Sequence, residues 1–350
     1  MSSSKGKGPV RPPAGGKAGQ SGSGPRRLGN QAQPKSRQGS TGAARRYDRS
    51  HHKRPAWMSW AAVGVAVAVV AVLVLVKVIG GSTSTASASD ASGRHPAPAP
   101  ASLVSALATI PASTFNSVGT DAQPAPFTVT AHQDPLALDG KPQFVYEGGE
   151  FCPYCALMRW SMISALSRFG TFSGLKLMSS ATTDGDIPTF SFVGARYTSK
   201  YVTFTPYEAE DRLQQPLQTP PGYVDKLYAK YDGNGATPAA PFNPSSSAGI
   251  PFLDIGNKYV AAGDPSAMAA IFAQYGVLDN GGPGRAAIAA ALRNPSSAVG
   301  TTIYAKVFIA QANYISAAIC ALDGGKPASV CSSPGVQAAA KVLASAKTVS

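Results

Sequence analysis

The sequence predicts an α/β domain with a helical C-terminal extension, preceded by a disordered basic tail and one transmembrane helix. Three observations predict this arrangement. An uncharged apolar run separates the basic tail from the remainder of the 350-residue chain. Beyond that run, strand-like and helix-like stretches alternate around a Cys-x-x-Cys pair. From about residue 284 onward, the apolar pattern is helical only.

The first segment, residues 1–56, is basic and of low complexity. It carries thirteen Lys or Arg residues against a single acid, Asp48. It has almost no large apolar side chain and cannot bury enough surface to offset the entropy cost of ordering, so we predict a disordered cytoplasmic tail. The net charge of +13 belongs to this tail, because 18 basic residues face 17 acidic ones from Trp57 onward.

The tail has two interpretations. It is a solvated segment, or it binds anionic membrane lipid, where each Lys or Arg beside the headgroups contributes ~1 kcal/mol. Specific nucleic-acid binding is not expected, because almost no aromatic side chains alternate with the charges. In the second interpretation, membrane lipid is the binding partner of this segment.

Residues 57–79 predict the transmembrane helix. The 20 residues from Trp57 to Val76 carry no charge, and at about 1.5 Å each they span ~30 Å, the thickness of a hydrocarbon core. The basic tail precedes them, so the positive-inside rule places the N-terminus in the cytoplasm and the C-terminal domain outside it. A cleaved secretory signal, with Ala86-Ser87-Ala88 as the cleavage site, is the alternative; it also places the domain outside the cytoplasm.

Residues 80–101 are mostly Ser, Thr, Ala, Gly and Pro, and we expect a spacer that separates the next domain from the membrane. Residues 102–350 form the folded extracytoplasmic domain. Helices are expected over residues 102–110, 155–168, 223–231, 267–275, 286–292, 301–322 and 336–346. Strands are expected over residues 143–146 and 175–178, and hairpins over residues 189–204 and 250–261.

The strongest chemical signal is Cys152-Pro153-Tyr154-Cys155, between an apolar strand and a helix. Cys152 would be the helix N-cap with Pro153 at the first helical position, where a missing N–H costs nothing. The unpaired N–H groups and the helix dipole favour a thiolate there, which predicts Cys152 as the nucleophile. Cys155 lies one turn further on the same face and can resolve a mixed disulfide.

Metal and cofactor sites are not expected at this pair. A structural zinc site needs about four ligands, but the other two cysteines lie far along the chain, and beyond the membrane segment the only histidines are His95 and His132. Haem attachment needs a histidine after the second cysteine, and residue 156 is Ala156. An inert disulfide between Cys152 and Cys155, in a non-catalytic binding or envelope scaffold module, is the alternative that stays open.

The remaining cysteines, Cys320 and Cys331, flank a short link between two expected helices. Outside the cytoplasm, a structural disulfide is the first interpretation. Closing so short a loop contributes on the order of 2–3 kcal/mol. A second redox pair that relays electrons to or from Cys152 and Cys155 is the alternative.

Several stretches resemble known proteins. The run Phe144-Val145-Tyr146 followed by the Cys-Pro-Tyr-Cys tetrad is similar to a thioredoxin-fold redox site, and the tetrad itself is like that of glutaredoxins. More closely, residues 146–172, 189–207 and 250–259 resemble the thioredoxin-like family named for domain of unknown function 929. This resemblance covers about residues 102–350.

The thioredoxin fold implies a cis-proline that faces the cysteine pair just before a strand. Pro251 matches this position because Phe252-Leu253-Asp254 follow it, and Pro188 is the alternative. The separation of Cys155 from Pro251 is longer than in a minimal thioredoxin. The resemblance therefore implies an insertion over about residues 181–249, besides the helical extension over about residues 284–350.

The charged residues near the Cys152–Cys155 pair are expected to be solvent-exposed and to have no special function. Arg159 is expected to be a solvated helical arginine. Glu147 and Glu150 are expected to be surface carboxylates, with tuning of the Cys152 pKa or proton transfer as the alternative. Tyr154 is expected to be exposed and available to a partner.

Together these observations predict a membrane-anchored, extracytoplasmic thiol–disulfide oxidoreductase that uses Cys152, Cys155 and Pro251. The expected partners are protein thiols or disulfides and a membrane redox partner, with no cofactor and no metal. The direction of electron flow depends on the reduction potential, for which the sequence holds no value.

Overall fold

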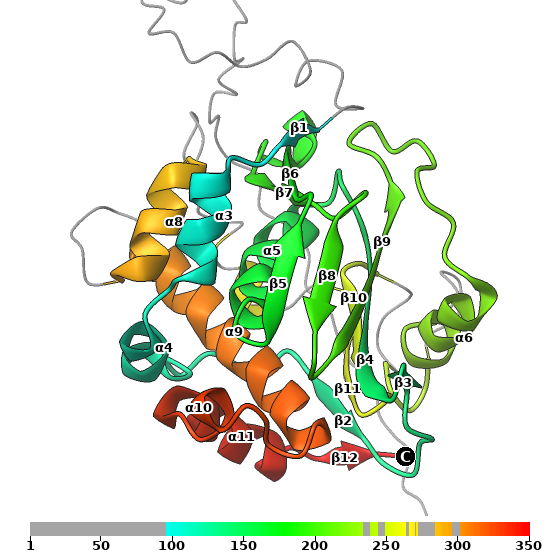
Figure 1. The fold of residues 1–350 in the computed structure, drawn as a ribbon. Helices are drawn as coiled ribbons and strands as arrows, with labels where there is room; N and C mark the ends of the chain where they lie inside the picture. Colours follow the sequence, from blue (N-terminus) through cyan, green and yellow to red (C-terminus); the bar gives the residue numbers. More distant parts are fainter. Residues whose placement is uncertain are drawn as a thin grey trace, which may run out of the picture. The chain divides into compact units, whose positions relative to one another are not determined.

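The computed structural model describes residues 96–350 except residues 234–238, 244–248, 264–265, 270, 272–283 and 296–301 (Figure 1). The expected tail, the transmembrane helix and most of the spacer lie outside the described residues. The described residues all belong to one compact unit, Ser82–Ser350.

A seven-stranded mixed sheet forms the centre of an α/β fold. Its order is β12-β2-β11-β10-β4-β3, and β9 also pairs with β4. The strands are β2 (Thr128–Thr130), β3 (Ala137–Leu138), β4 (Lys141–Gly149), β9 (Thr203–Glu210), β10 (Phe252–Ile255), β11 (Tyr259–Ala261) and β12 (Thr348–Val349).

Strand β4 lies at the middle of this sheet. It pairs antiparallel with β10, with Glu147 opposite Phe252, and parallel with β9, with Gly148 opposite Glu208. Its apolar segment 144–146 is fully buried, because neighbouring strands and both covering layers remove it from water. The end of β4 is thereby held at one place, directly before the cysteine pair.

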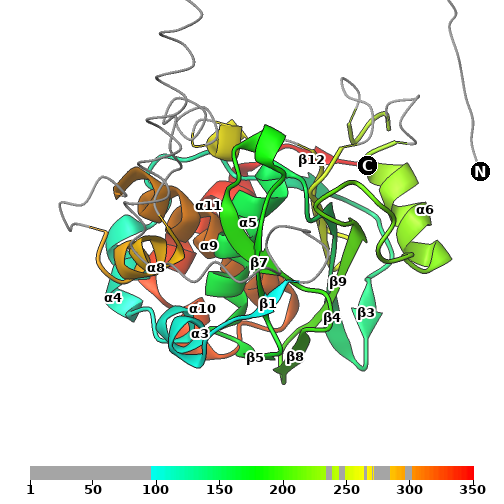
Figure 2. The ribbon, with the colours of Figure 1, turned by 90° about the horizontal axis from the view of Figure 1, so that it is seen from above.

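Helices cover both faces of the sheet (Figures 1 and 2). Helix α5 packs on one face and against α9, where Trp160 stacks on Phe308 with ring centroids 6.3 Å apart. Helix α6 lies on the other face, where Tyr228 contacts Phe252. The helices are α3 (Ala101–Ala108), α4 (Ala112–Val118), α5 (Pro153–Leu166), α6 (Gly222–Tyr231), α8 (Arg285–Arg293), α9 (Thr302–Leu322), α10 (Ala328–Cys331) and α11 (Pro334–Ser345), with a 3₁₀ turn η1 (Thr182–Asp184).

Helix α9 is the one described helix that is long and apolar enough to cross a membrane, over Ile303–Leu322. Within the fold, 78% of its most apolar window is buried. The aromatic and aliphatic side chains of its inner face pack on α5 and α11, which is how a core helix of a folded domain is used.

The expected hairpin over residues 189–204 is wrong. β7 (Pro188–Ser191) pairs with β6 (Lys176–Ser179), and β8 (Arg196–Ser199) pairs with β5 (Gly170–Ser173). The next strand, β9, pairs with β4 instead, because Phe204 packs on Phe144 with ring centroids 5.2 Å apart. Burial against a distant apolar strand outweighs the local turn signal.

The stretch expected as an insertion, residues 181–249, therefore contains two elements of the main layers, β9 and α6. Of the additional small strands over residues 170–199, β5 and β6 lie before this stretch and β7 and β8 lie within it. The end of the expected spacer is also structured, since β1 (Ala97–Pro98) pairs with β6. The hairpin of β10 and β11 and the helices α3, α5, α6, α8, α9 and α11 agree with the expected ranges to within a few residues.

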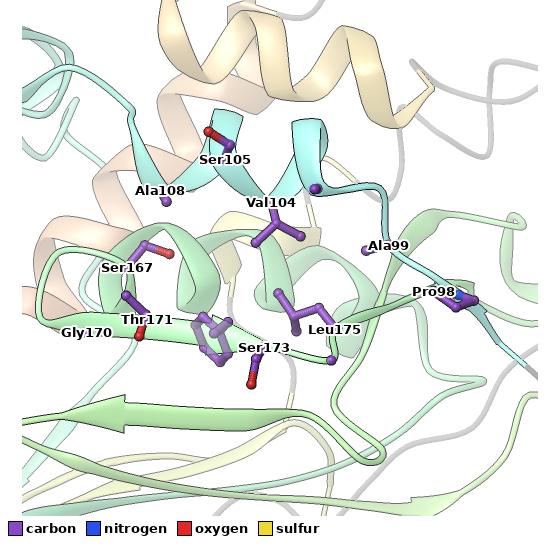
Figure 3. A pocket seen from close by; sticks show the side chains of 13 residues that line it. Pro98, Ala99, Val104, Ser105, Ala108, Ser167, Gly170, Thr171, Ser173 and Leu175 are labelled. Atoms are coloured by element: carbon purple, nitrogen blue, oxygen red, sulfur yellow. The ribbon is translucent and has the colours of Figure 1, made fainter.

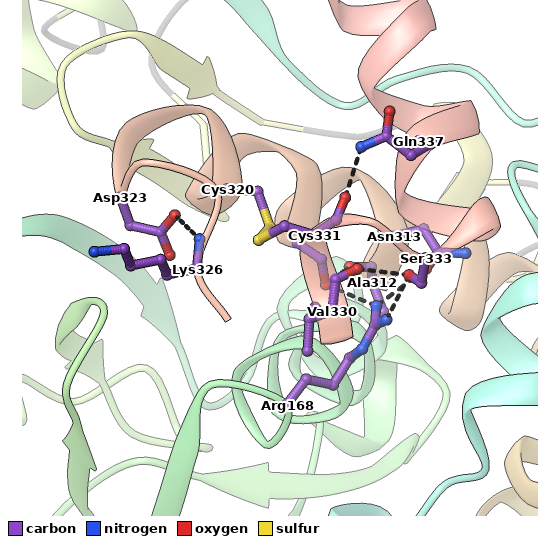
Figure 4. The surroundings of a disulfide bond; sticks show 11 residues. Arg168, Ala312, Asn313, Cys320, Asp323, Lys326, Val330, Cys331, Ser333 and Gln337 are labelled. Atoms are coloured by element: carbon purple, nitrogen blue, oxygen red, sulfur yellow. Dashed lines mark hydrogen bonds between the residues drawn. A yellow bond between two sulfur atoms is a disulfide. The ribbon is translucent and has the colours of Figure 1, made fainter. Parts of the chain in front are cut away.

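A disulfide joins Cys320 at the end of α9 to Cys331 in α10 (Figure 4). Beside it, Arg168 from the end of α5 donates hydrogen bonds to Asn313, Ser316 and Ser333. Hydrogen bonds from Arg168, just past the end of α5, thus connect this helix to the helical extension. The disulfide crosslinks two helices within the extension, α9 and α10.

Replacing both disulfide cysteines, Cys320→Ser with Cys331→Ser, should lower the free energy of unfolding by about 3 kcal/mol, because the closed loop spans 11 residues. Denaturant unfolding followed by tryptophan fluorescence measures this loss. Reductant should reproduce it in the wild-type chain and leave the double variant unchanged. Equal stability of the wild type and the double variant would contradict the structural interpretation of this disulfide.

Candidate functional site

Cys152 is the N-cap of α5. Its backbone is extended, with φ −69° and ψ 126°, Pro153 follows at the first helical position, and the N–H of Cys155 donates to Cys152 Sγ at 3.2 Å. Both cysteines are free thiols and both are buried. Because β4 ends at Gly149, only three residues separate the central strand of the sheet from this helix start.

Pro251 lies opposite the cysteine pair. The Ile250–Pro251 peptide bond is cis, and Cys152 Sγ donates to the carbonyl of Ile250 at 3.7 Å. Strand β10 follows directly and pairs with β4. Pro188 instead opens β7, and its carbonyl accepts a hydrogen bond from the indole of Trp160 at 3.0 Å. The structure therefore brings Pro251, and not Pro188, to Cys152.

The two thiols differ in acidity. Burial alone would raise the pKa of Cys152, but hydrogen bonds from the side chain and backbone of Cys155, together with the charge of Arg159, outweigh burial and lower it. Burial raises the pKa of Cys155 well above its ordinary value, and its hydrogen bond to Cys152 raises it further. The pair thus favours a thiolate at Cys152 and a neutral thiol at Cys155.

The expectation of a solvated Arg159 is wrong, because its side chain is 0% exposed. Its Nε donates to Glu208 Oε1 at 3.0 Å, and its Nη2 donates to Glu208 Oε2 at 2.6 Å and to the carbonyl of Gly149 at 2.8 Å. A sequence signal for this burial existed. Arg159 is the only charged residue between Cys155 and Leu166, and every residue of that segment is buried.

Glu150 is also not the expected surface carboxylate. It is 1% exposed, and the hydroxyl of Ser191 donates to its Oε1 at 2.5 Å. Burial is the main cause that raises its pKa to about 7. Glu147 is half-buried on the face of the sheet that α6 covers, and burial, followed by Asp225 and Asp232, raises its pKa to about 7.

Two further residues complete the surroundings of the pair. Tyr146 is fully buried, and its hydroxyl donates to Glu208 Oε2 at 3.5 Å. A Cβ added at Gly148 would lie 2.1 Å from the Tyr146 hydroxyl and 3.1 Å from Cys155 Sγ. Residue 148 must therefore be glycine for the phenol and the thiol to approach each other. Tyr154, expected to be exposed, is half-buried.

The second cysteine pair lies at the other end of β4. A Cβ at Gly256, in the turn between β10 and β11, would lie 2.4 Å from Leu322, two residues after Cys320. That turn follows Ile255, which pairs with Phe144. From Phe144 to Gly149 the strand extends roughly 17 Å at about 3.3 Å per residue. The two cysteine pairs thus lie toward opposite ends of β4, an arrangement that favours the structural interpretation of the Cys320–Cys331 disulfide over direct electron relay.

A cavity of about 530 Å³ lies elsewhere, between α3 and β5 (Figure 3). Val104 and Leu175 line it, together with Ser167 just past the end of α5. Since Cys152 lies at the opposite end of this helix of 14 residues, the cavity is separate from the cysteine pair. Over the described residues, no three His, Cys, Asp or Glu side chains lie close enough together to hold a metal ion.

Comparison with known proteins gives one family. The family described as domain of unknown function (DUF929) matches residues 127–321, which is more than half of the chain. This range contains the cysteine pair, Pro251, Arg159 and Glu208. No curated protein and no solved structure matches the chain.

The buried carboxyl of Glu150 predicts an unusual pH dependence of stability. Its folded-state pKa of about 7 lies above the ordinary 4.5, so its contribution is present below pH 4.5 and is lost as the pH rises through 7. Glu150→Gln keeps the Ser191 contact without a charge. Between pH 4.5 and 8 the wild type should lose up to about 3 kcal/mol more than this variant. Denaturant unfolding across this pH range measures the difference.

Asp139→Asn, in the exposed turn between β3 and β4, is the matched control. Its stability is measured over the same pH range, to show the effect of removing an exposed carboxyl. A curve for Glu150→Gln that runs parallel to that of the wild type would show that Glu150 is ionised normally in the folded state.

Proposed function

The chain belongs to the DUF929 family, and we propose that it is a thiol–disulfide oxidoreductase that acts on protein thiols or disulfides through Cys152 and Cys155. One observation carries this proposal. Cys152 Sγ lies at the start of α5, accepts the Cys155 N–H and faces the carbonyl of Ile250 beside the cis-proline Pro251. A buried pair with one acidic thiol and one neutral thiol is suited to exchange chemistry.

The same features support a thioredoxin-like fold as part of the proposal. A Cys-x-x-Cys pair begins the helix that follows the central strand, and a cis-proline opens the next strand of the sheet beside it. The glutaredoxin-like tetrad Cys152-Pro153-Tyr154-Cys155 agrees with this assignment. The extra strands over residues 170–199 and the helices after residue 284 are then additions to that fold.

In the reducing direction, the Cys152 thiolate attacks one sulfur of a substrate disulfide. A mixed disulfide forms, and the other substrate sulfur leaves as a thiolate. Cys155 then loses its proton and attacks Cys152 Sγ, which forms the Cys152–Cys155 disulfide and releases the second substrate thiolate. The substrate gains two electrons and the protein dithiol loses them. Proton uptake by the released substrate thiolates balances the protons lost by the cysteines.

In this proposed scheme, each part of the site has a task. The N–H of Cys155 and the start of α5 stabilise the attacking thiolate. The high pKa of Cys155 keeps this thiol neutral until a mixed disulfide has formed. Opposite them, the carbonyl of Ile250 beside Pro251 contacts Cys152 Sγ, and in this proposal the substrate backbone approaches from that side.

We place this domain outside the cytoplasm, attached by the apolar segment over residues 57–79. The disulfide between Cys320 and Cys331 supports an oxidising compartment, where such bonds persist. The basic tail, residues 1–56, would then contact anionic lipid on the cytoplasmic side. A membrane redox partner would regenerate the cysteine pair.

Cys155→Ser should trap a mixed disulfide with a protein substrate, because the residue that resolves it is gone. Cys152→Ser should trap none, since the attacking thiolate is lost. Non-reducing electrophoresis of the full-length chain after incubation with a disulfide-containing protein measures the adduct. The double variant is the background control.

An adduct trapped in Cys152→Ser but not in Cys155→Ser would show that Cys155 is the attacking thiol and Cys152 the resolving one. The absence of any adduct in either variant, together with a Cys152 pKa near the unperturbed ~8.5, would contradict the proposed function. It would favour a static module that does not turn over.

A further inference from the structure

Two opposite charges are buried directly behind the cysteine pair. Arg159 and Glu208 are both 0% exposed. Taking a charge out of water is costly, and apolar side chains of similar volume often stabilise a fold as well as a buried ion pair does. Stability alone therefore does not explain why Arg159 and Glu208 are buried here, and the groups next to them have to be considered.

Arg159 adjoins the cysteines in two ways. It follows Cys155 by four residues on α5 and therefore lies on the same face of the helix. Its Nη2 also donates to the carbonyl of Gly149 at 2.8 Å, and that carbonyl accepts the N–H of Cys152. The backbone N–H of Gly149, in turn, hydrogen-bonds to Cys155. One residue, Gly149, thus connects the guanidinium to both cysteines through its carbonyl and its N–H.

Arg159 also has an unused donor. Its Nη1 is buried and meets no hydrogen-bond acceptor among the described residues. The charge of the guanidinium is matched by Glu208, but in the described part of the chain its Nη1 side has no acceptor that would screen its field there. A positive charge that is incompletely screened in a dry environment acts strongly on nearby anions, and the anion that forms here during exchange is a thiolate.

Glu208 reaches the cluster from the opposite side. It lies on β9, across from Gly148, and it binds Nε and Nη2 of Arg159 while its Oε1 also accepts the N–H of Phe192. The Tyr146 hydroxyl, which lies close to Cys155 Sγ, donates to Glu208 Oε2. Glu208 thus holds the guanidinium in place and offsets part of its charge.

We propose that Arg159 and Glu208 are positioning residues that set the reduction potential of the Cys152–Cys155 pair with opposite signs. This inference rests on the proposed exchange function and adds the control of its electron flow. A cation that stabilises the thiolate stabilises the reduced dithiol and makes the disulfide a stronger oxidant. The carboxylate opposes this effect. The balance between the two charges decides whether the protein gives or takes disulfides.

Two uncharged variants of similar size test the signs, Arg159→Met and Glu208→Gln. The full-length chain is equilibrated in glutathione redox buffers, and the rate of Cys152 alkylation is followed against pH. Arg159→Met should shift the equilibrium about tenfold toward the disulfide, about 30 mV, and raise the pH of half-maximal alkylation. Glu208→Gln should move both readouts in the opposite direction.

Two controls separate charge from packing. Arg159→Lys keeps the cation but loses the bidentate contact, and its potential should stay near that of the wild type. Arg168→Met removes another arginine, half-buried just past the end of the same helix, one that contacts Asn313, Ser316 and Ser333 at the end of α5 remote from Cys152. It should lower stability without moving the potential.

If Arg159 and Glu208 had only a structural role, the two substitutions would shift the reduction potential in the same direction or leave it unchanged. Either result, with a wild type that exchanges normally, would overturn this inference and leave the proposed function standing. A wild type that does not equilibrate with glutathione would overturn the proposed function itself. If Arg159→Met does not fold, the direction of the potential shift in Glu208→Gln and the potential of Arg159→Lys test the inference instead.

Discussion

The buried contact between Arg159 and Glu208 joins the elements on which the rest of the site depends. The guanidinium comes from α5, the carboxylate from β9, and the third partner, the carbonyl of Gly149, ends β4. Buried polar groups must find their hydrogen bonds within the protein, so these three elements are held in one arrangement. That arrangement places Cys152 and Cys155 above the carboxyl ends of two parallel strands and next to Pro251. Loss of any of the three partners would leave a charge or a dipole unpaired behind the thiols.

The cysteines near the two ends of β4 are in different states, free thiols at one end and a disulfide near the other. At its carboxyl end, Cys152 and Cys155 are free thiols that differ in acidity. Near its start, the turn after β10 packs on Leu322, beside the disulfide that closes the helical extension. The strand separates the two pairs, so the free thiols and the crosslink occupy different parts of the fold. Glu150 and Glu147, whose pKa values burial raises to about 7, lie at the carboxyl end of β4 with the free thiols.

Sequence patterns predicted the elements whose signals are local. Helix α5 followed from Pro153 and the apolar run after it, and the hairpin of β10 and β11 followed from the turn at Gly256 and Asn257. Strand β9 was assigned to the wrong partner, because its pairing depends on contact with Phe144, about 60 residues away along the chain. The burial of Glu150 and the buried partner of Arg159 were missed for the same reason, although the apolar segment around Arg159 was itself a local signal of burial. Their partners, Glu208 and Ser191, lie on strands whose placement no local signal specifies.

The sequence by itself determined the order of the tail, the apolar segment and the folded domain, and it identified Cys152, Cys155 and Pro251 as the candidate site. The order of the segments and the cysteine pair depend on composition and on short spacings, which are properties of the chain alone. Pro251 was implied by the resemblance to the thioredoxin fold, with Pro188 as the alternative. Only the tertiary structure decided which charges lie behind the thiols, how far apart the two cysteine pairs are, and which proline faces Cys152. Each of these depends on which surfaces become buried together. The free energies of ions, and hence the acidity of the thiols, are set by that burial and not by neighbours in the chain.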